Sequence, residues 1–287
     1  MNISKIKLQN VSKVYKQADQ FEIILRNCSF EIKPGKLTVL IGPSGCGKST
    51  LIKLIAGYES PTMGSIQIGE KDISGPGPDR AVVFQETALF PWMTLKDNIV
   101  FGPIQQGVSK SLAQKRSMEL LSKVGLNGFE DKFPHQVSGG MQRRAELARA
   151  FINDPKIMLL DEPFRGLDHM TRGLMQEYYS SLFEETHKTT LFVTSEVDEA
   201  IFLADEIIVL SYKPTSLKAL IEVDLPRPRD FKMMTSLSYG KLKNKIISLL
   251  YEEALKGFSA GVSKSAEMKD LIEVSLLQEQ FLENKKD

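Results

Sequence analysis

Apolar residues recur along the chain in short runs that predict strands of two kinds. Residues 3–8 alternate apolar and polar positions, and residues 21–32 are rich in Ile and Phe, which favours strands of an antiparallel layer. Continuous apolar runs instead predict strands buried on both faces, and they span residues 37–41, 81–84, 157–160, 191–193 and 207–210. Helical patterns separate most of these runs, so the sequence predicts an α/β fold with a parallel sheet.

Residues 86 to about 150 interrupt this alternation and predict a mostly helical insert. Helical patterns are clearest over residues 112–124 and 140–151. A proline-rich stretch at 225–230 precedes a tail that is rich in Lys and Glu and favours helix. We therefore predict a main domain over residues 1–250, with a helical lobe inserted at about 86–150, and a C-terminal tail over 251–287. The tail is either regulatory or a frayed helix.

Charge and composition limit the kinds of partner that this chain can have. The 37 basic and 36 acidic residues give a formal net charge of +1, which lacks the basic footprint of a nucleic-acid binder, so we expect no nucleic-acid partner. No apolar run approaches the roughly 20 residues of a membrane helix, so any membrane role must come through a partner. Lysines interrupt the apolar residues of the N-terminus, which does not resemble a signal peptide. The two cysteines suggest no disulfide framework and indicate a reducing compartment.

A phosphate-binding motif follows the first buried strand. Gly42 to Ser49 match G-x-x-x-x-G-K-[ST], and a helical pattern follows that stops near Gly57. Glycines let backbone N–H groups wrap a phosphate, and a helix N-terminus attracts the anion. Lys48 is expected to reach the β- and γ-phosphates, and Ser49 to bind Mg²⁺. The predicted nucleotide-binding residues of this loop are Gly42, Pro43, Ser44, Gly45, Cys46, Gly47, Lys48, Ser49 and Thr50.

Cys46 is the unusual member of this loop. A helix N-terminus rich in backbone donors favours a thiolate, so we expect maleimide to label Cys46 and Mg-ATP to protect it. The alternative is a small buried side chain that never reacts.

A pair of carboxylates ends a second buried strand, at Asp161 and Glu162. A carboxylate in this place can hold Mg²⁺, and its neighbour can orient the attacking water. Many strands end in acidic loops, so this pair of carboxylates is informative only because the chain also carries the phosphate-binding motif. We predict Asp161 as a metal ligand and Glu162 as a catalytic residue.

A third motif lies before Asp161. Residues 137–142 read Val-Ser-Gly-Gly-Met-Gln, continue into a helical pattern, and resemble the signature of ABC ATPases. The resemblance covers roughly residues 3–250. It implies a P-loop NTPase (RecA-like) core with an antiparallel β layer, an inserted helical lobe and a helical C-terminal tail. In that family the signature contacts ATP held by a second ABC ATPase subunit, so Ser138, Gly139 and Gly140 are expected to complete a partner's site.

The resemblance assigns further roles. Tyr15 resembles the aromatic residue that stacks on adenine, although a tyrosine at a strand edge is the alternative. Gln85 resembles the glutamine that senses Mg²⁺ and links the lobes, so it is predicted both as a metal ligand and as a catalytic residue. Asp168 resembles part of the loop that crosses the dimer interface.

Four stretches resemble the nitrate, sulfonate and taurine importer branch: residues 75–85, 90–98, 133–136 and 224–229. The branch implies a subunit that binds and hydrolyses ATP with Mg²⁺ on the cytoplasmic side of the membrane. It also implies membrane permease subunits as partners and, indirectly, a periplasmic or extracellular solute-binding protein, which leaves the solute unidentified. A groove near Phe90 and Trp92 is expected to receive a permease helix, unless these rings are buried within the helical lobe. An ABC ATPase of DNA repair would need a long coiled-coil insert, and the about 90 residues between Ser49 and Ser138 are too few.

The sequence departs from the family at several positions. Ser195 stands where the family carries a histidine that contacts the γ-phosphate, and a hydroxyl is shorter and uncharged. Arg165 and Gly166 stand where Gly and Ala are usual, Arg143 replaces Gln, and Ala145 and Glu146 replace a β-branched and a small residue. Two interpretations remain: an active but slower ATPase with Ser195 in its catalytic set, or a weakened nucleotide-binding subunit paired with an intact ATPase subunit.

Overall fold

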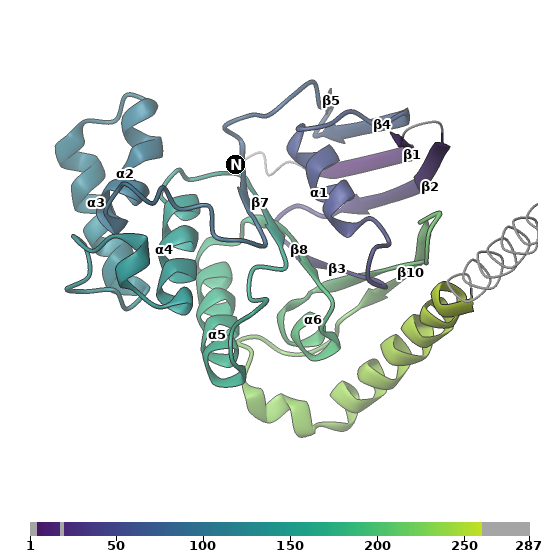
Figure 1. Cartoon of the computed structure of the whole chain (residues 1–287). Helices are drawn as coiled ribbons and strands as arrows, with labels where there is room; N and C mark the ends of the chain where they lie inside the picture. Colours follow the sequence, from purple (N-terminus) through teal and green to yellow (C-terminus); the bar gives the residue numbers. More distant parts are fainter. Residues whose placement is uncertain (1–4, 18–19, 260–287) are drawn as a thin grey trace, which may run out of the picture.

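The computed structural model describes residues 5–17 and 20–259, which form two sheets and a helical lobe (Figure 1). The first sheet is antiparallel, with strand order β2-β1-β4-β5. Its strands are β1 (Ile6–Gln17), β2 (Gln20–Ile32), β4 (Met63–Ile68) and β5 (Lys71–Asp72). The predicted antiparallel layer is therefore present.

The second sheet has six strands in the order β10-β9-β3-β8-β7-β6. They are β3 (Leu37–Ile41), β6 (Arg80–Val83), β7 (Ile157–Asp161), β8 (Thr189–Thr194), β9 (Glu206–Leu210) and β10 (Leu217–Glu222). All neighbours pair in parallel except β10, which runs antiparallel along β9. The five parallel strands are the five apolar runs of the sequence.

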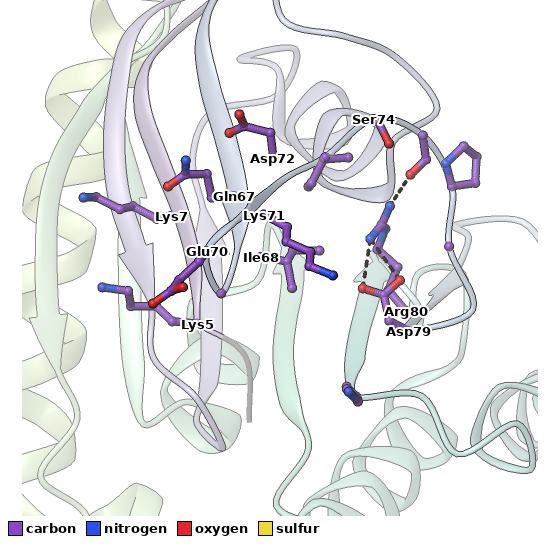
Figure 2. Close-up of a pocket in the computed structure, with 16 residues that line it drawn as sticks. Lys5, Lys7, Gln67, Ile68, Glu70, Lys71, Asp72, Ser74, Asp79 and Arg80 are labelled. Carbon is purple, nitrogen blue, oxygen red and sulfur yellow. Dashed lines mark hydrogen bonds and ion pairs between the residues drawn. The ribbon is translucent and has the colours of Figure 1, made fainter. Parts of the chain in front are cut away.

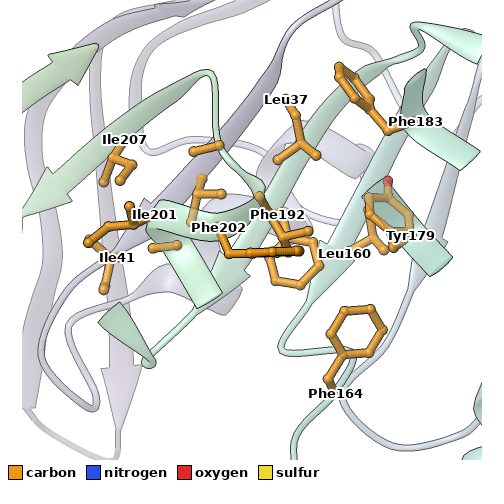
Figure 3. Close-up of a cluster of buried hydrophobic side chains, with 14 of the residues drawn as sticks. Leu37, Ile41, Leu160, Phe164, Tyr179, Phe183, Phe192, Ile201, Phe202 and Ile207 are labelled. Carbon is orange, nitrogen blue, oxygen red and sulfur yellow. The ribbon is translucent and has the colours of Figure 1, made fainter. Parts of the chain in front are cut away.

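Alternate residues of these strands enter two different cores. Leu40 packs with α1 (Lys48–Ala56) and the first sheet, whereas Leu37, Val39 and Ile41 face the opposite side. On that side, α5 (His169–Thr186) and α6 (Val197–Leu203) cover the sheet with an aromatic-rich cluster (Figure 3). Because both faces of the sheet are covered, the side chains on each face are apolar, and the strands show no alternation of apolar and polar residues in the sequence.

The predicted helical insert forms a lobe with its own core. It contains α2 (Leu95–Gln105), α3 (Lys110–Lys123), the 3₁₀ turn η1 (Pro134–Gln136) and α4 (Gly139–Phe151). Ala145 and Ala148 of α4 pack within the lobe, while Leu147 and Phe151 pack against the large sheet. Helix α4 therefore joins the lobe to the sheet.

The C-terminal part of the described chain is helical. After η2 (Phe231–Thr235), a helix spans residues 237–259 and buries Tyr239 and Ile246. The helix runs through residue 250 without interruption, and the division of the chain there stays a prediction. Most of the predicted tail lies outside the described residues. Among the helices that the structure describes, none has the length and apolar character needed to cross a bilayer.

Candidate functional site

The phosphate loop has the strand–loop–helix setting that its motif predicts. It follows β3, and Gly47 caps the N-terminus of α1 with a φ of 100°. A Cβ atom at Gly47 would lie 2.7 Å from the Ile24 side chain, so both the backbone conformation and the space require glycine.

Lys48 is fixed by this loop. Its side chain is 7% exposed, and Nζ donates to the carbonyl oxygens of Gly42 at 3.0 Å and Pro43 at 3.1 Å. The same Nζ lies 4.0 Å from Glu162 Oε1, at the end of β7. The fold therefore brings the lysine of the loop to the carboxylate that the second motif predicts.

Asp161 has the character of a ligand for a hard cation. The residue is 8% exposed, and its Oδ1 has no hydrogen-bond partner. Burial raises the pKa of the carboxyl, while the Ser49 hydroxyl and the Lys48 charge act in the opposite direction. An unpartnered buried oxygen beside a hydroxyl suits Mg²⁺, which prefers oxygen ligands. These two residues therefore fit the predicted metal.

The position of Gln85 gives less support to its predicted role as a metal ligand. Its side chain is exposed, and its backbone carbonyl accepts a hydrogen bond from Arg143 at 2.5 Å. Within residues 5–17 and 20–259, the Gln85 side chain makes no hydrogen bond to Ser49 or Asp161. The structure brings two of the three predicted metal ligands together and leaves the third apart.

Glu162 occupies a strained backbone position. Its φ is 44°, in the left-handed region that costs a side-chain-bearing residue about 1–3 kcal/mol, and such positions cluster at functional sites. The backbone N–H donates to the Val193 carbonyl at 2.9 Å, and the side chain is 12% exposed. Its Oε2 lies 3.0 Å from Arg165 Nη1, a partner that the motifs did not indicate. Ser195 is exposed and lines a small cavity together with Glu162.

Tyr15 lies beside the phosphate-loop helix. Its hydroxyl donates to Glu59 Oε2 at 2.5 Å, and Lys13 Nζ lies 5.0 Å from the ring centroid. Burial, with a smaller contribution from the Glu59 contact, raises the pKa of Tyr15 to about 12, while the Thr50 hydroxyl acts in the opposite direction. The interaction with Thr50 places the Tyr15 side chain beside the phosphate-loop helix, and the adenine-stacking role stays a prediction. Glu59 was missed because it lies far from Tyr15 in sequence.

The expectation for the Cys46 thiol is wrong. The residue is fully buried and belongs to the core between the two sheets, and burial raises the pKa of its thiol. Its backbone carbonyl accepts a hydrogen bond from the Thr215 hydroxyl. The loop's anion-binding groups are backbone N–H groups, and the side chain points away from them into the core, where a thiolate is disfavoured.

The signature residues lie apart from the phosphate loop of the same chain. Ser138 caps α4 and accepts a hydrogen bond from the Met141 N–H at 3.3 Å, and Ser138 and Gly139 are exposed. Figure 1 shows α4 in the helical lobe, separated from α1. Asp168 caps α5 and is also exposed. A single chain therefore presents these groups to solvent, where a second molecule can reach them.

One departure from the signature pattern, Arg143, connects the helical lobe to the segment after β6. The guanidinium of Arg143, on α4, donates to the carbonyl oxygens of Phe84 at 2.7 Å and of Gln85 at 2.5 Å. The signature helix and the segment after β6 are thus held by one buried side chain. The sequence flagged Arg143 as unusual without indicating these contacts.

A large hollow of the described chain lies away from these residues. It measures about 1090 Å³ and lies between the first sheet and the start of β6 (Figure 2). Its lining mixes lysines with acidic residues, and Arg80 is already bound to Asp79. No predicted site residue lines it, so this hollow is not the nucleotide site.

Comparisons with known proteins place the chain in a family. A family model described as ABC transporter matches residues 25–165. The bicarbonate transport ATP-binding protein CmpD of Synechocystis sp. is 39% identical over 248 residues, which cover 85% of this chain and 88% of that protein. The chain belongs to the ABC transporter family.

Two further similarities place it within the family. The nitrate import ATP-binding protein NrtC of Synechococcus elongatus is 41% identical over 235 residues, 80% of this chain and 36% of that longer protein. A dimeric ATP-binding cassette in a post-hydrolysis state, bound to ADP and Pi, is 30% identical with a TM-score of 0.69, covering 77% of this chain and all of that one. These findings confirm the nitrate importer branch, the fold and an ABC-type ATPase subunit of a transporter.

Proposed function

We propose that this chain binds Mg-ATP and hydrolyses it to drive uptake of a small solute in an importer of the nitrate, sulfonate and taurine kind. The observation that carries the proposal is the meeting of Lys48 with the end of β7, where Glu162 lies 4.0 Å from the lysine and Asp161 adjoins Ser49. The relatives named for nitrate and bicarbonate support an importer of small anions.

In the proposed site, the loop amides and Lys48 hold the phosphates and Tyr15 packs on adenine. Ser49 and Asp161 would hold Mg²⁺, with Gln85 proposed to join them as a third ligand, and the metal would neutralise charge on the phosphate oxygens. Glu162 orients the attacking water. Most of the rate enhancement in such chemistry comes from positioning and charge stabilisation, which a preorganised loop and a fixed carboxylate provide.

Two subunits are required in this proposal. The N-terminus of α4, with Ser138 and Gly139 exposed and Gly140 half-buried, offers its positive helix end to the γ-phosphate of ATP held by the second subunit. ATP binding closes the dimer and hydrolysis releases it. The second subunit is either another copy of this chain or a homologous, intact ATPase that compensates for weaker chemistry at Ser195.

The permease is proposed to dock at a groove of about 360 Å³ beside the helical lobe, lined in part by Ala88, Phe90 and Phe101. Trp92 is 70% exposed and stacks on Phe90 at 5.5 Å between ring centroids. Exposed aromatic residues are frequent interface anchors. This contact would hold the chain at the cytoplasmic face of the membrane, with the solute-binding protein acting on the permease from the other side.

The proposal is tested by reconstituting the chain with its permease in vesicles and measuring ATP hydrolysis and solute uptake. Glu162→Gln should retain ATP binding and abolish hydrolysis, whereas the exposed Glu177→Gln control should behave as the wild type. Wild-type chain that binds no ATP, or that co-purifies with nucleic acid rather than a permease, would contradict the proposal. Silencing the site of a homologous partner shows which subunit carries the turnover.

A further inference from the structure

A small cavity adjoins the carboxylate of Glu162. It measures about 30 Å³ and is lined by Glu162, Arg165, Ser195 and Glu199, among others. A polar cavity needs about 10–15 Å³ and two to four polar partners to hold a water molecule, so this one has room for one or two. It is therefore the place in the described chain where a water would lie against Glu162.

Arg165 is the cation that reaches this carboxylate from the solvent side. Its Nη1 lies 3.0 Å from Glu162 Oε2, and the other carboxylate oxygen lies 4.0 Å from Lys48 Nζ. The carboxylate is thus held between a cation of the phosphate loop and a cation of the turn that follows β7. A guanidinium stays charged at all relevant pH values and offers several donors in a fixed plane.

Ser195 contributes no charge to the same cavity. Its hydroxyl can donate or accept a hydrogen bond, but it cannot supply the positive charge of the histidine that the family carries at this position. Arg165 stands where that family usually has glycine. The two departures therefore meet in one cavity, one removing a cationic group and the other adding one.

We propose that Arg165 takes over the positioning role of the missing histidine by holding Glu162 and a water in this cavity. The inference rests on the proposed ATP hydrolysis at this chain's own site. Arg165 is a positioning residue here, because it acts through Glu162. As an ordinary ion pair it would matter little, since its side chain is 62% exposed and solvent screens such pairs.

The test is a double-mutant cycle in the assembled complex, with the partner's site silenced and single-turnover hydrolysis measured. Arg165→Gln should slow hydrolysis about tenfold or more and leave ATP affinity within about twofold, because removing one preorganised contact costs up to 10²–10³ in rate. The same change in a Ser195→His background should cost less than about threefold. Arg165→Lys should restore part of the rate, and the exposed Arg116→Gln should change nothing.

Three results would overturn the inference. They are an equal loss of hydrolysis rate in both backgrounds, no loss in either, or faster hydrolysis after Arg165→Gln, which would show that the arginine inhibits hydrolysis. Failure of the proposed function has a different signature. A wild-type chain that does not bind ATP, or that binds it and hydrolyses none, refutes the function itself, whereas a chain that hydrolyses ATP at a rate that Arg165→Gln leaves unchanged overturns this inference alone.

Discussion

The guanidinium of Arg143 lies 2.6 Å from the carboxylate of Glu146, one helical turn along α4, and the two side chains are only 5% and 2% exposed. Burial lowers the pKa of Arg143 and raises that of Glu146, and each partner's charge opposes these shifts. Glu146 also accepts a hydrogen bond from the Ala88 N–H at 3.1 Å. Through these hydrogen bonds the pair links the segment after β6 to the signature helix, α4.

Arg143→Gln should destabilise the chain by about 3–5 kcal/mol, because it leaves a buried carboxylate without its cation. The double substitution Arg143→Gln with Glu146→Ala should recover most of this loss, since it removes both charges. Denaturant unfolding measures each variant, with the exposed pair Lys123 and Glu185 as a control expected to contribute below about 1 kcal/mol. Losses that simply add in the double variant would show that the two residues are not coupled.

Cys46 should be inert in the native chain. Burial raises the pKa of its thiol and closes access to it, so maleimide at pH 8 should label neither Cys46 nor the equally buried Cys28, whose pKa is raised to about 11. Both should react after denaturation, and Mg-ATP should make no difference to the native result. Rapid labelling of Cys46 in the native chain, suppressed by ATP, would show instead that the thiol faces solvent.

The sequence predicted the parts of the molecule that depend on local pattern. Five apolar runs became the five parallel strands, and the glycine motif became a loop between β3 and α1. The Cys46 side chain was mispredicted because its direction is set by the loop's backbone conformation and by packing against the sheet, which no spacing rule encodes.

The contacts within the site were harder to predict than its members. Arg143 and Glu146 are spaced for a helical ion pair, but their burial depends on Phe84 and Gln85, which lie almost 60 residues away in sequence. Glu59, in the segment that follows α1, accepts a hydrogen bond from Tyr15 of the first sheet, 44 residues away in sequence. Such pairings follow from tertiary packing, so the sequence showed which residues were unusual but not what they contact.

Trp92→Ala should weaken assembly with the permease at least tenfold while leaving ATP binding intact. The ring is 70% exposed, so truncation removes little that stabilises the isolated chain, whereas an interface anchor contributes about 2 kcal/mol or more. Co-purification at graded salt measures assembly, and the exposed Tyr251→Ala serves as control. A lower melting temperature with unaltered assembly would show instead that Trp92 supports the lobe.

Lys48→Ala should lower ATP affinity at least tenfold, or by about 1.4 kcal/mol, because it removes the cation that the loop positions for phosphate. Titration with a fluorescent ATP analogue measures this, and the exposed Lys36→Ala should bind normally. Lys48 also bonds the Gly42 and Pro43 carbonyls, so a structural role would appear as lost thermal stability with unchanged affinity.

Asp161→Asn separates the metal role from a structural one. Burying an unpartnered carboxylate oxygen is unfavourable, so replacing Asp161 with the neutral isostere should not lower the stability of the ligand-free chain. The variant should instead lose most of the gain in ATP affinity that Mg²⁺ gives the wild type over EDTA, while binding in EDTA stays similar. The exposed Asp72→Asn should keep the full Mg²⁺ effect. The loss of a metal ligand must appear in the part of the ATP affinity that depends on Mg²⁺. An Asp161→Asn chain that unfolds more readily yet responds normally to Mg²⁺ would therefore mean that the carboxylate stabilises the loop and does not bind the cation.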